Sequence, residues 1–260
     1  MMEAVAQAFT ALVAAFGWPT LAFLAFMTLV TSAVHGATGV AGGFLMAAVL
    51  ANFIGAKATV PVMSVALLAS HSSRAILNVG AIDARAFRIV ALSAVPMIAI
   101  VAYGYGRLSS PAVAGILGVI LTCAVFMRRY ARRRAITAGP KLLATAGAGY
   151  GILSGASIGP GLFLSPFLLG FGLGREAFVA TLACVAVLAN LTRTVVFGST
   201  DLLSVQWVVL GVLIGLFTIP GNWVGRTVLR AMSDARHASV VDLFCLVGAA
   251  NFFWLAVAGG

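Results

Sequence analysis

Charged side chains are scarce in this sequence: only 8% of its 260 residues are Asp, Glu, Lys or Arg, whereas 62% are hydrophobic. A soluble domain typically has about 25% charged residues, because groups that water solvates have to cover its surface. The shortage excludes a soluble fold. It predicts an all-α integral membrane protein that uses lipid as its solvent.

The sequence also lacks the residue clusters of a metal centre or an active site. Its three cysteines, Cys123, Cys184 and Cys245, stand singly in apolar stretches, and we interpret them as small core residues. No nucleophile is accompanied by a base and an orienting acid. We therefore expect no metal, no cofactor and no enzymatic activity. The N-terminus has no Lys or Arg before its first apolar run, so we expect no cleaved signal peptide.

The net charge of +10 does not indicate a nucleic-acid partner, because the arginines separate apolar runs instead of forming one basic face. Spanning the hydrocarbon layer takes about 20 helical residues. Two of the apolar runs, each preceded by a glycine-rich break, are short for a full span, and whether they cross or re-enter is open. We place the runs at 10–34, 42–56 (short), 58–80, 87–105, 110–127, 142–157, 161–174 (short), 177–198, 205–225 and 239–258.

The chain resembles itself at a shift of 119 positions, which brings Arg74 onto Arg193 and His71 onto Asn190. Arginine is rare inside membranes, so a chance match of two such arginines is improbable. We predict a single transmembrane domain over 1–260 that consists of two repeats of about five helical segments each. Repeat one covers about 10–127, a basic linker covers 128–141, and repeat two covers about 142–258.

The loop charges indicate how the two repeats are oriented. The linker contains the densest basic tract, which predicts that it is cytoplasmic. Alternating spans then put Arg85 and Arg88 inside, while the equivalent loop around Asp201 has no basic residue and falls outside. Equivalent loops on opposite faces predict an inverted-topology repeat, which is a common transporter plan, with both termini outside.

Glycine-rich breaks at 35–43 and 154–161 open the two repeats, each as a predicted helical hairpin. Helices that restart after such a break present free N–H groups and the positive end of the helix dipole, which favour an anion. The alternative is that these glycines only allow helices to pack closely. The candidate binding residues of the breaks are His35, Thr38, Gly42, Gly43, Ser154, Ser157, Gly159 and Gly161.

Arg74 and Arg193 lie within apolar runs, where an uncompensated arginine costs several kcal/mol. All six acidic residues lie in loops, at run ends or at the terminus, so a mobile anion or a water-filled cavity is expected to compensate these cations. The alternative is that both side chains snorkel to the interface as anchors. Helical spacing adds neighbouring polar groups that can bind an oxyanion, namely His71, Asn78, Asn190 and Thr194.

At these residues the sequence resembles the TauE/SafE sulfite-exporter family of bacterial membrane proteins, over essentially the whole chain. The second half carries Ser154-Gly155, Gly159-Pro160-Gly161 and Ser165-Pro166-Phe167-Leu168. The first half keeps Gly39 and Gly42-Gly43 but has Ala47-Ala48 where a proline is expected. The resemblance implies transport of small sulfur oxyanions or organosulfonates of the sulfite, sulfoacetate or sulfolactate type.

Together, the residues and the resemblance predict a transporter of the bacterial inner membrane that exports a small anion by alternating access at a midplane site. An inside-negative potential drives an anion outward with about 2.3 kcal/mol per charge per 100 mV. A carboxylate transporter is the alternative, since arginine binds carboxylates as readily as sulfonates. The expected partners are the anionic substrate and the lipid bilayer, and a homodimer remains open.

Overall fold

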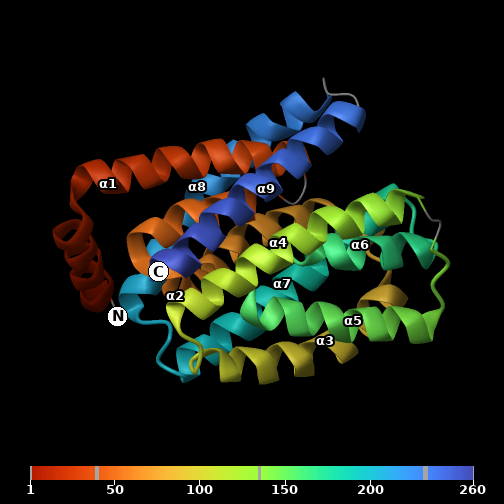
Figure 1. The fold of residues 1–260 in the computed structure, drawn as a ribbon, viewed down its shortest axis with the longest axis horizontal. Helices are drawn as coiled ribbons and strands as arrows, with labels where there is room; N and C mark the ends of the chain where they lie inside the picture. The colour runs from red at the N-terminus through yellow and green to blue at the C-terminus, as the bar shows by residue number, and fades with distance from the viewer. Residues whose placement is uncertain (1, 39–40, 134–135, 231–233, 260) are drawn as a thin grey trace.

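The computed structural model describes residues 2–38, 41–133, 136–230 and 234–259, and these residues form helices without any strand (Figure 1). The all-α class is therefore confirmed for the described part of the chain. The elements are α1 (Met2–Thr38), α2 (Ala41–Leu77), the 3-10 turn η1 (Val79–Ala81), α3 (Ala84–Tyr105), α4 (Ser110–Arg133), α5 (Pro140–Ala156), α6 (Gly161–Gly170), α7 (Arg175–Ser199), α8 (Val205–Arg230) and α9 (Asp234–Ala258).

Six of the described helices are long and apolar enough to cross a membrane, and they contain most of the predicted apolar runs. The short run at 161–174 forms α6, which has 10 residues. At 1.5 Å per residue such a helix is about 15 Å long, half of the hydrocarbon thickness, so α6 does not span by itself. The candidate spans are Met2–Val34, Gly42–Ile76, Ala84–Tyr105, Ser110–Met127, Glu176–Ser199 and Val205–Gly225.

Two glycines kink the long N-terminal helices. The structure joins the predicted runs 42–56 and 58–80 into α2, which bends at Gly55 with φ 75° and ψ 157°. In α1 the bend lies at Gly17, where φ is 71°, and the residues before it fold away from the rest of the helix (Figure 1). Glycine adopts a positive φ without steric cost, whereas other residues do so only at a cost. The glycines at positions 17 and 55 therefore determine where the two helices bend.

The helices pack in pairs around a central contact between α2 and α7. Along one side α1 lies against α8, along the other α3 lies against α5, and α4 lies against α9 (Figure 1). The α3–α5 contact uses glycines at every fourth position of α5: Gly147, Gly151 and Gly155. A Cβ at Gly151 would lie 2.4 Å from the carbonyl oxygen of Ala94, so only glycine permits this approach.

Candidate functional site

The break between α5 and α6 turns the chain back inside the helix bundle. Ser157, after the end of α5, is extended with φ −145° and ψ 175°, and α6 begins at Gly161. Gly159 has φ 70°, and a Cβ there would lie 2.8 Å from the ring of Phe44. This glycine therefore makes the turn, whereas Gly155, whose Cβ would lie 2.5 Å from Val101, serves helix packing.

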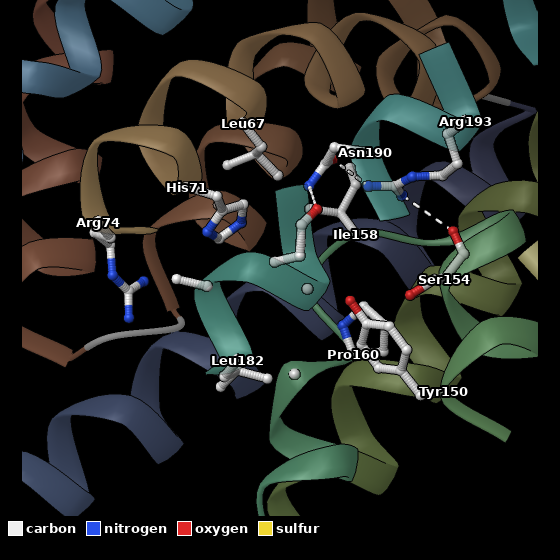
Figure 2. Close-up of a pocket in the computed structure, with 15 residues that line it drawn as sticks. Leu67, His71, Arg74, Tyr150, Ser154, Ile158, Pro160, Leu182, Asn190 and Arg193 are labelled. Carbon is white, nitrogen blue, oxygen red and sulfur yellow. Dashed lines mark hydrogen bonds between the residues drawn. The ribbon is translucent and has the colours of Figure 1, made fainter. Parts of the chain in front are cut away.

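Arg193 on α7 is only 2% exposed and reaches across to this break. Its Nη1 donates to the carbonyl oxygen of Ser154 at 3.1 Å, and its Nη2 donates to Oδ1 of Asn190 (Figure 2). The same Nη1 also donates to the carbonyl oxygen of Ser157. A cation at the C-terminal end of a helix is stabilised by the negative end of the helix dipole. Arg193 is thus held inside the protein and does not snorkel, while its Nε is buried without a hydrogen-bond partner.

A cavity of about 40 Å³ lies between α2, α5, α6 and α7. Figure 2 shows Arg193 at one side of this cavity and Arg74, with His71, at the other. Among the residues that the structure describes, no aspartate or glutamate lines the cavity, so two guanidinium groups give it a positive potential. Its lining consists of Gly43, Leu67, His71, Arg74, Tyr150, Ser154, Ile158, Gly159, Pro160, Gly161, Leu182, Ala183, Ala186, Asn190 and Arg193.

The cavity brings together eight of the residues that the sequence singled out, from both repeats. They are Gly43, His71, Arg74, Ser154, Gly159, Gly161, Asn190 and Arg193. Ser157 contributes its backbone carbonyl to Arg193 and does not line the cavity.

Other candidate residues lie elsewhere. The side-chain amide of Asn78 donates to the carbonyl oxygen of Arg74 at 2.8 Å, and the hydroxyl of Thr194 is hydrogen-bonded to that of Ser64 at 3.1 Å. Gly42 lines a second, smaller cavity. The side chains of His35 and Thr38 lie outside the described part of the structure.

The walls of the cavity were not predicted from the sequence. Tyr150, which is 3% exposed, precedes Ser154 by one helical turn on α5, and Figure 2 shows its hydroxyl on the cavity side of the helix. The spacing of four residues could have identified it, because such residues share a helix face. The apolar walls formed by Leu67, Ile158 and Leu182 have no comparable signal, since ordinary core leucines follow the same pattern.

Comparison with known protein families gives a match over nearly the whole chain. The model of the family described as "Sulfite exporter TauE/SafE" matches residues 5–252. No curated protein and no solved structure matches the chain in the corresponding comparisons. With six membrane-length helices among the described residues and a family match of this extent, the chain belongs to the TauE/SafE sulfite exporter family of multi-pass membrane transporters.

Proposed function

We propose that this protein exports a small oxyanion, sulfite or a small organosulfonate, through the cavity between Arg193 and Arg74. The observation that carries the proposal is a cavity with two guanidinium groups and, among its described lining residues, no carboxylate. Arginine offers a planar fork of N–H donors that matches oxyanions. The Nε–H of Arg193, buried without a partner, is a further donor for an anion oxygen once the cavity widens.

The size of the cavity favours the smallest candidates. One water molecule needs about 10–15 Å³ of such space, so a cavity of about 40 Å³ has room for roughly three water-sized groups. Sulfite consists of one sulfur and three oxygen atoms. Sulfoacetate and sulfolactate carry an additional carboxylate and therefore require a wider state of the cavity. We propose sulfite as the preferred substrate, with a small carboxylate as the alternative.

Alternating access through an inverted repeat is part of the proposal. The shift of 119 carries α1 onto α5, α3 onto α8 and α4 onto α9, so that the α1–α8 contact corresponds to the α5–α3 contact. The same shift carries Gly55, at the kink of α2, onto Gly174, between α6 and α7. This matched packing supports repeats over 10–127 and 142–258 in one domain, joined by the linker 128–141.

We further propose that the protein lies in the bacterial inner membrane, with the linker cytoplasmic and both termini outside. Two single cysteines test the orientation, in a chain whose native cysteines are replaced by alanine. Ala84→Cys and Ser199→Cys place thiols at exposed helix ends, beside the two loops that the proposed repeat makes equivalent. A membrane-impermeant maleimide added to intact cells should label Ser199→Cys only. Labelling of both from the same side contradicts the inverted repeat.

Flux in proteoliposomes tests the transport function. Vesicles loaded with sulfite should release it faster when an imposed potassium diffusion potential makes the interior negative, because the cargo carries negative charge. Sulfite should leave faster than sulfoacetate or acetate at equal concentration. Arg107→Gln, in an exposed loop, is the control variant and should keep the wild-type rate. Flux that ignores the potential refutes electrogenic export, and faster acetate release favours the carboxylate alternative.

A further inference from the structure

Two hydroxyl groups lie on the wall that α5 contributes to the cavity between Arg193 and Arg74, the anion cavity. They belong to Tyr150 and Ser154, which are 3% and 1% exposed and lie one helical turn apart on the same face of α5. Figure 2 shows both hydroxyl oxygens on the cavity side of the helix. A solute held between the two arginines therefore faces this hydroxyl pair, Tyr150 and Ser154.

The hydroxyl of Ser154 is not used by its own helix. Serine and threonine side chains in helices often donate to the carbonyl oxygen four residues earlier. Three neighbours along the chain make this bond, at 3.1, 2.6 and 2.6 Å: Thr145, Ser157 and Ser165. Ser154 does not make it, and its Oγ is buried without a hydrogen-bond partner. This hydroxyl is therefore turned away from the helix, toward the cavity that it lines.

A bond between the two hydroxyls does not satisfy both of them. If Tyr150 donates to Oγ of Ser154, the serine proton is left without an acceptor. If Ser154 donates to Tyr150, the tyrosine proton is left instead. In either arrangement one O–H group remains for a solute in the anion cavity, and a buried donor of this kind calls for such an explanation.

Acceptors close to the hydroxyl pair are already in use. The carbonyl oxygen of Ser154 accepts from Nη1 of Arg193 at 3.1 Å, and Oδ1 of Asn190 accepts from its Nη2. Among the described lining residues there is no carboxylate that could accept instead. This wall of the cavity is therefore rich in donors, which suits the oxygen atom of an anion, because such an atom accepts hydrogen bonds and does not donate them.

From this arrangement we infer that Tyr150 and Ser154 are specificity-determining residues of the transporter. Arg193 and Arg74 each hold one oxygen atom of the anion, and the hydroxyl pair binds a third. The cavity thereby selects sulfite and sulfonates, which have three oxygen atoms on sulfur, over carboxylates. The inference rests on the proposed function, and it narrows the class of substrate for the same site.

A carboxylate is disfavoured because it has only two oxygen atoms. When both of them bind the arginines, its carbon substituent faces the hydroxyl pair and leaves a buried O–H group without an acceptor. A site that is built to hydrogen-bond its substrate rejects an analogue that lacks the bonding atom, for this reason. Removing a hydroxyl should therefore weaken the binding of sulfite and leave that of acetate nearly unchanged.

Tyr150→Phe tests the inference, because it removes one oxygen atom and keeps the ring. Initial rates of efflux from proteoliposomes give KM and the maximal rate for sulfite and for acetate. We expect KM for sulfite to rise by about tenfold, since a hydrogen bond to a charged group is lost, and KM for acetate to change by less than about twofold. Tyr103→Phe is the matched control, since this tyrosine of α3 is 65% exposed, and it should keep the wild-type values.

Ser154→Ala adds a measurement that separates binding from a structural role. The serine hydroxyl has no partner in the protein, so its removal should keep the wild-type Tm or raise it, while KM for sulfite rises by about tenfold. A structural hydroxyl behaves in the opposite way: Tm falls and KM for sulfite stays. If Tyr150→Phe fails to fold, Ser154→Ala still decides.

The outcomes distinguish this inference from the proposed function. A rise in KM for sulfite but not for acetate supports the role of the hydroxyl pair. Wild-type sulfite transport with an unchanged KM in Tyr150→Phe and Ser154→Ala overturns this role and leaves the proposed function intact, as does an equal rise of KM for both anions. A wild-type protein that carries acetate but not sulfite contradicts the proposed function itself.

Discussion

Arg74 and Arg193 occupy equivalent positions in the two halves of the sequence, yet they differ in burial and in their contacts. Arg193 is buried and bonded to the C-terminal end of α5, whereas Arg74 is partly exposed and stands three residues before α2 ends. Helix α7 continues for six residues beyond Arg193, so this arginine lies within its helix and not at the end of it. Arg193 thus holds the break after α5, whereas Arg74 lines the cavity near the end of its own helix.

The largest effect is expected from Arg193→Gln. The carbonyl oxygens of Ser154 and Ser157 and Oδ1 of Asn190 lose their charged donor, and a buried acceptor without a partner costs about 1–3 kcal/mol. We expect the free energy of unfolding to fall by about 2 kcal/mol or more and sulfite flux to fall by about 100-fold. Denaturation in detergent and proteoliposome flux measure these two quantities. Wild-type stability would show that the α5 contact is dispensable.

Arg74→Gln should separate transport from stability. The contact with the C-terminal end of α5 belongs to Arg193, so we expect Arg74→Gln to lower the free energy of unfolding less than Arg193→Gln does. We expect sulfite flux to fall by roughly 10-fold, with partial recovery in Arg74→Lys because lysine keeps the charge but loses the planar fork. If Arg74→Gln melts as early as Arg193→Gln, the two arginines have the same structural role and the comparison fails.

The sequence predicted the helical class and the place of the breaks, because both follow from local chemistry. Apolar runs of membrane length have to become helices in lipid. The turn at Gly159 has a positive φ, which glycine adopts more readily than other residues. The contacts of Arg193 could not be predicted, since backbone carbonyls such as that of Ser154 leave no signature in the sequence. The second, smaller cavity, which Gly42 lines, could not be predicted either, because Thr31, Ser70 and Thr218 come from three helices far apart in the chain.

The sequence alone also did not show whether a given glycine allows two helices to pack closely or allows the chain to turn. Gly151→Ala tests the α3–α5 contact, where the new Cβ would lie 2.4 Å from the oxygen of Ala94. We expect a loss of about 1–3 kcal/mol in the free energy of unfolding, because two helix backbones have to separate. Gly104→Ala on α3, where a new Cβ meets nothing within 4 Å, is the matched control and should be neutral or slightly stabilising. Equal effects of the two changes would contradict the close packing.

The smallest effect is expected from Ser157→Ala, which distinguishes a hydroxyl from a carbonyl role at the break. Arg193 bonds to the backbone oxygen of Ser157, while the hydroxyl donates only to Leu153 at 2.6 Å. The alanine variant keeps that carbonyl, so stability should change by about 1 kcal/mol or less and flux by less than about twofold. Ser157→Pro is the counterpart: proline fixes φ near −65°, whereas the residue has φ −145°, so the carbonyl has to move. Flux lost in the proline variant and kept in the alanine variant shows that the backbone of the break, held by Arg193, shapes the cavity. Flux lost in both assigns the hydroxyl a direct role and removes the distinction between the two arginines on which the comparison rests.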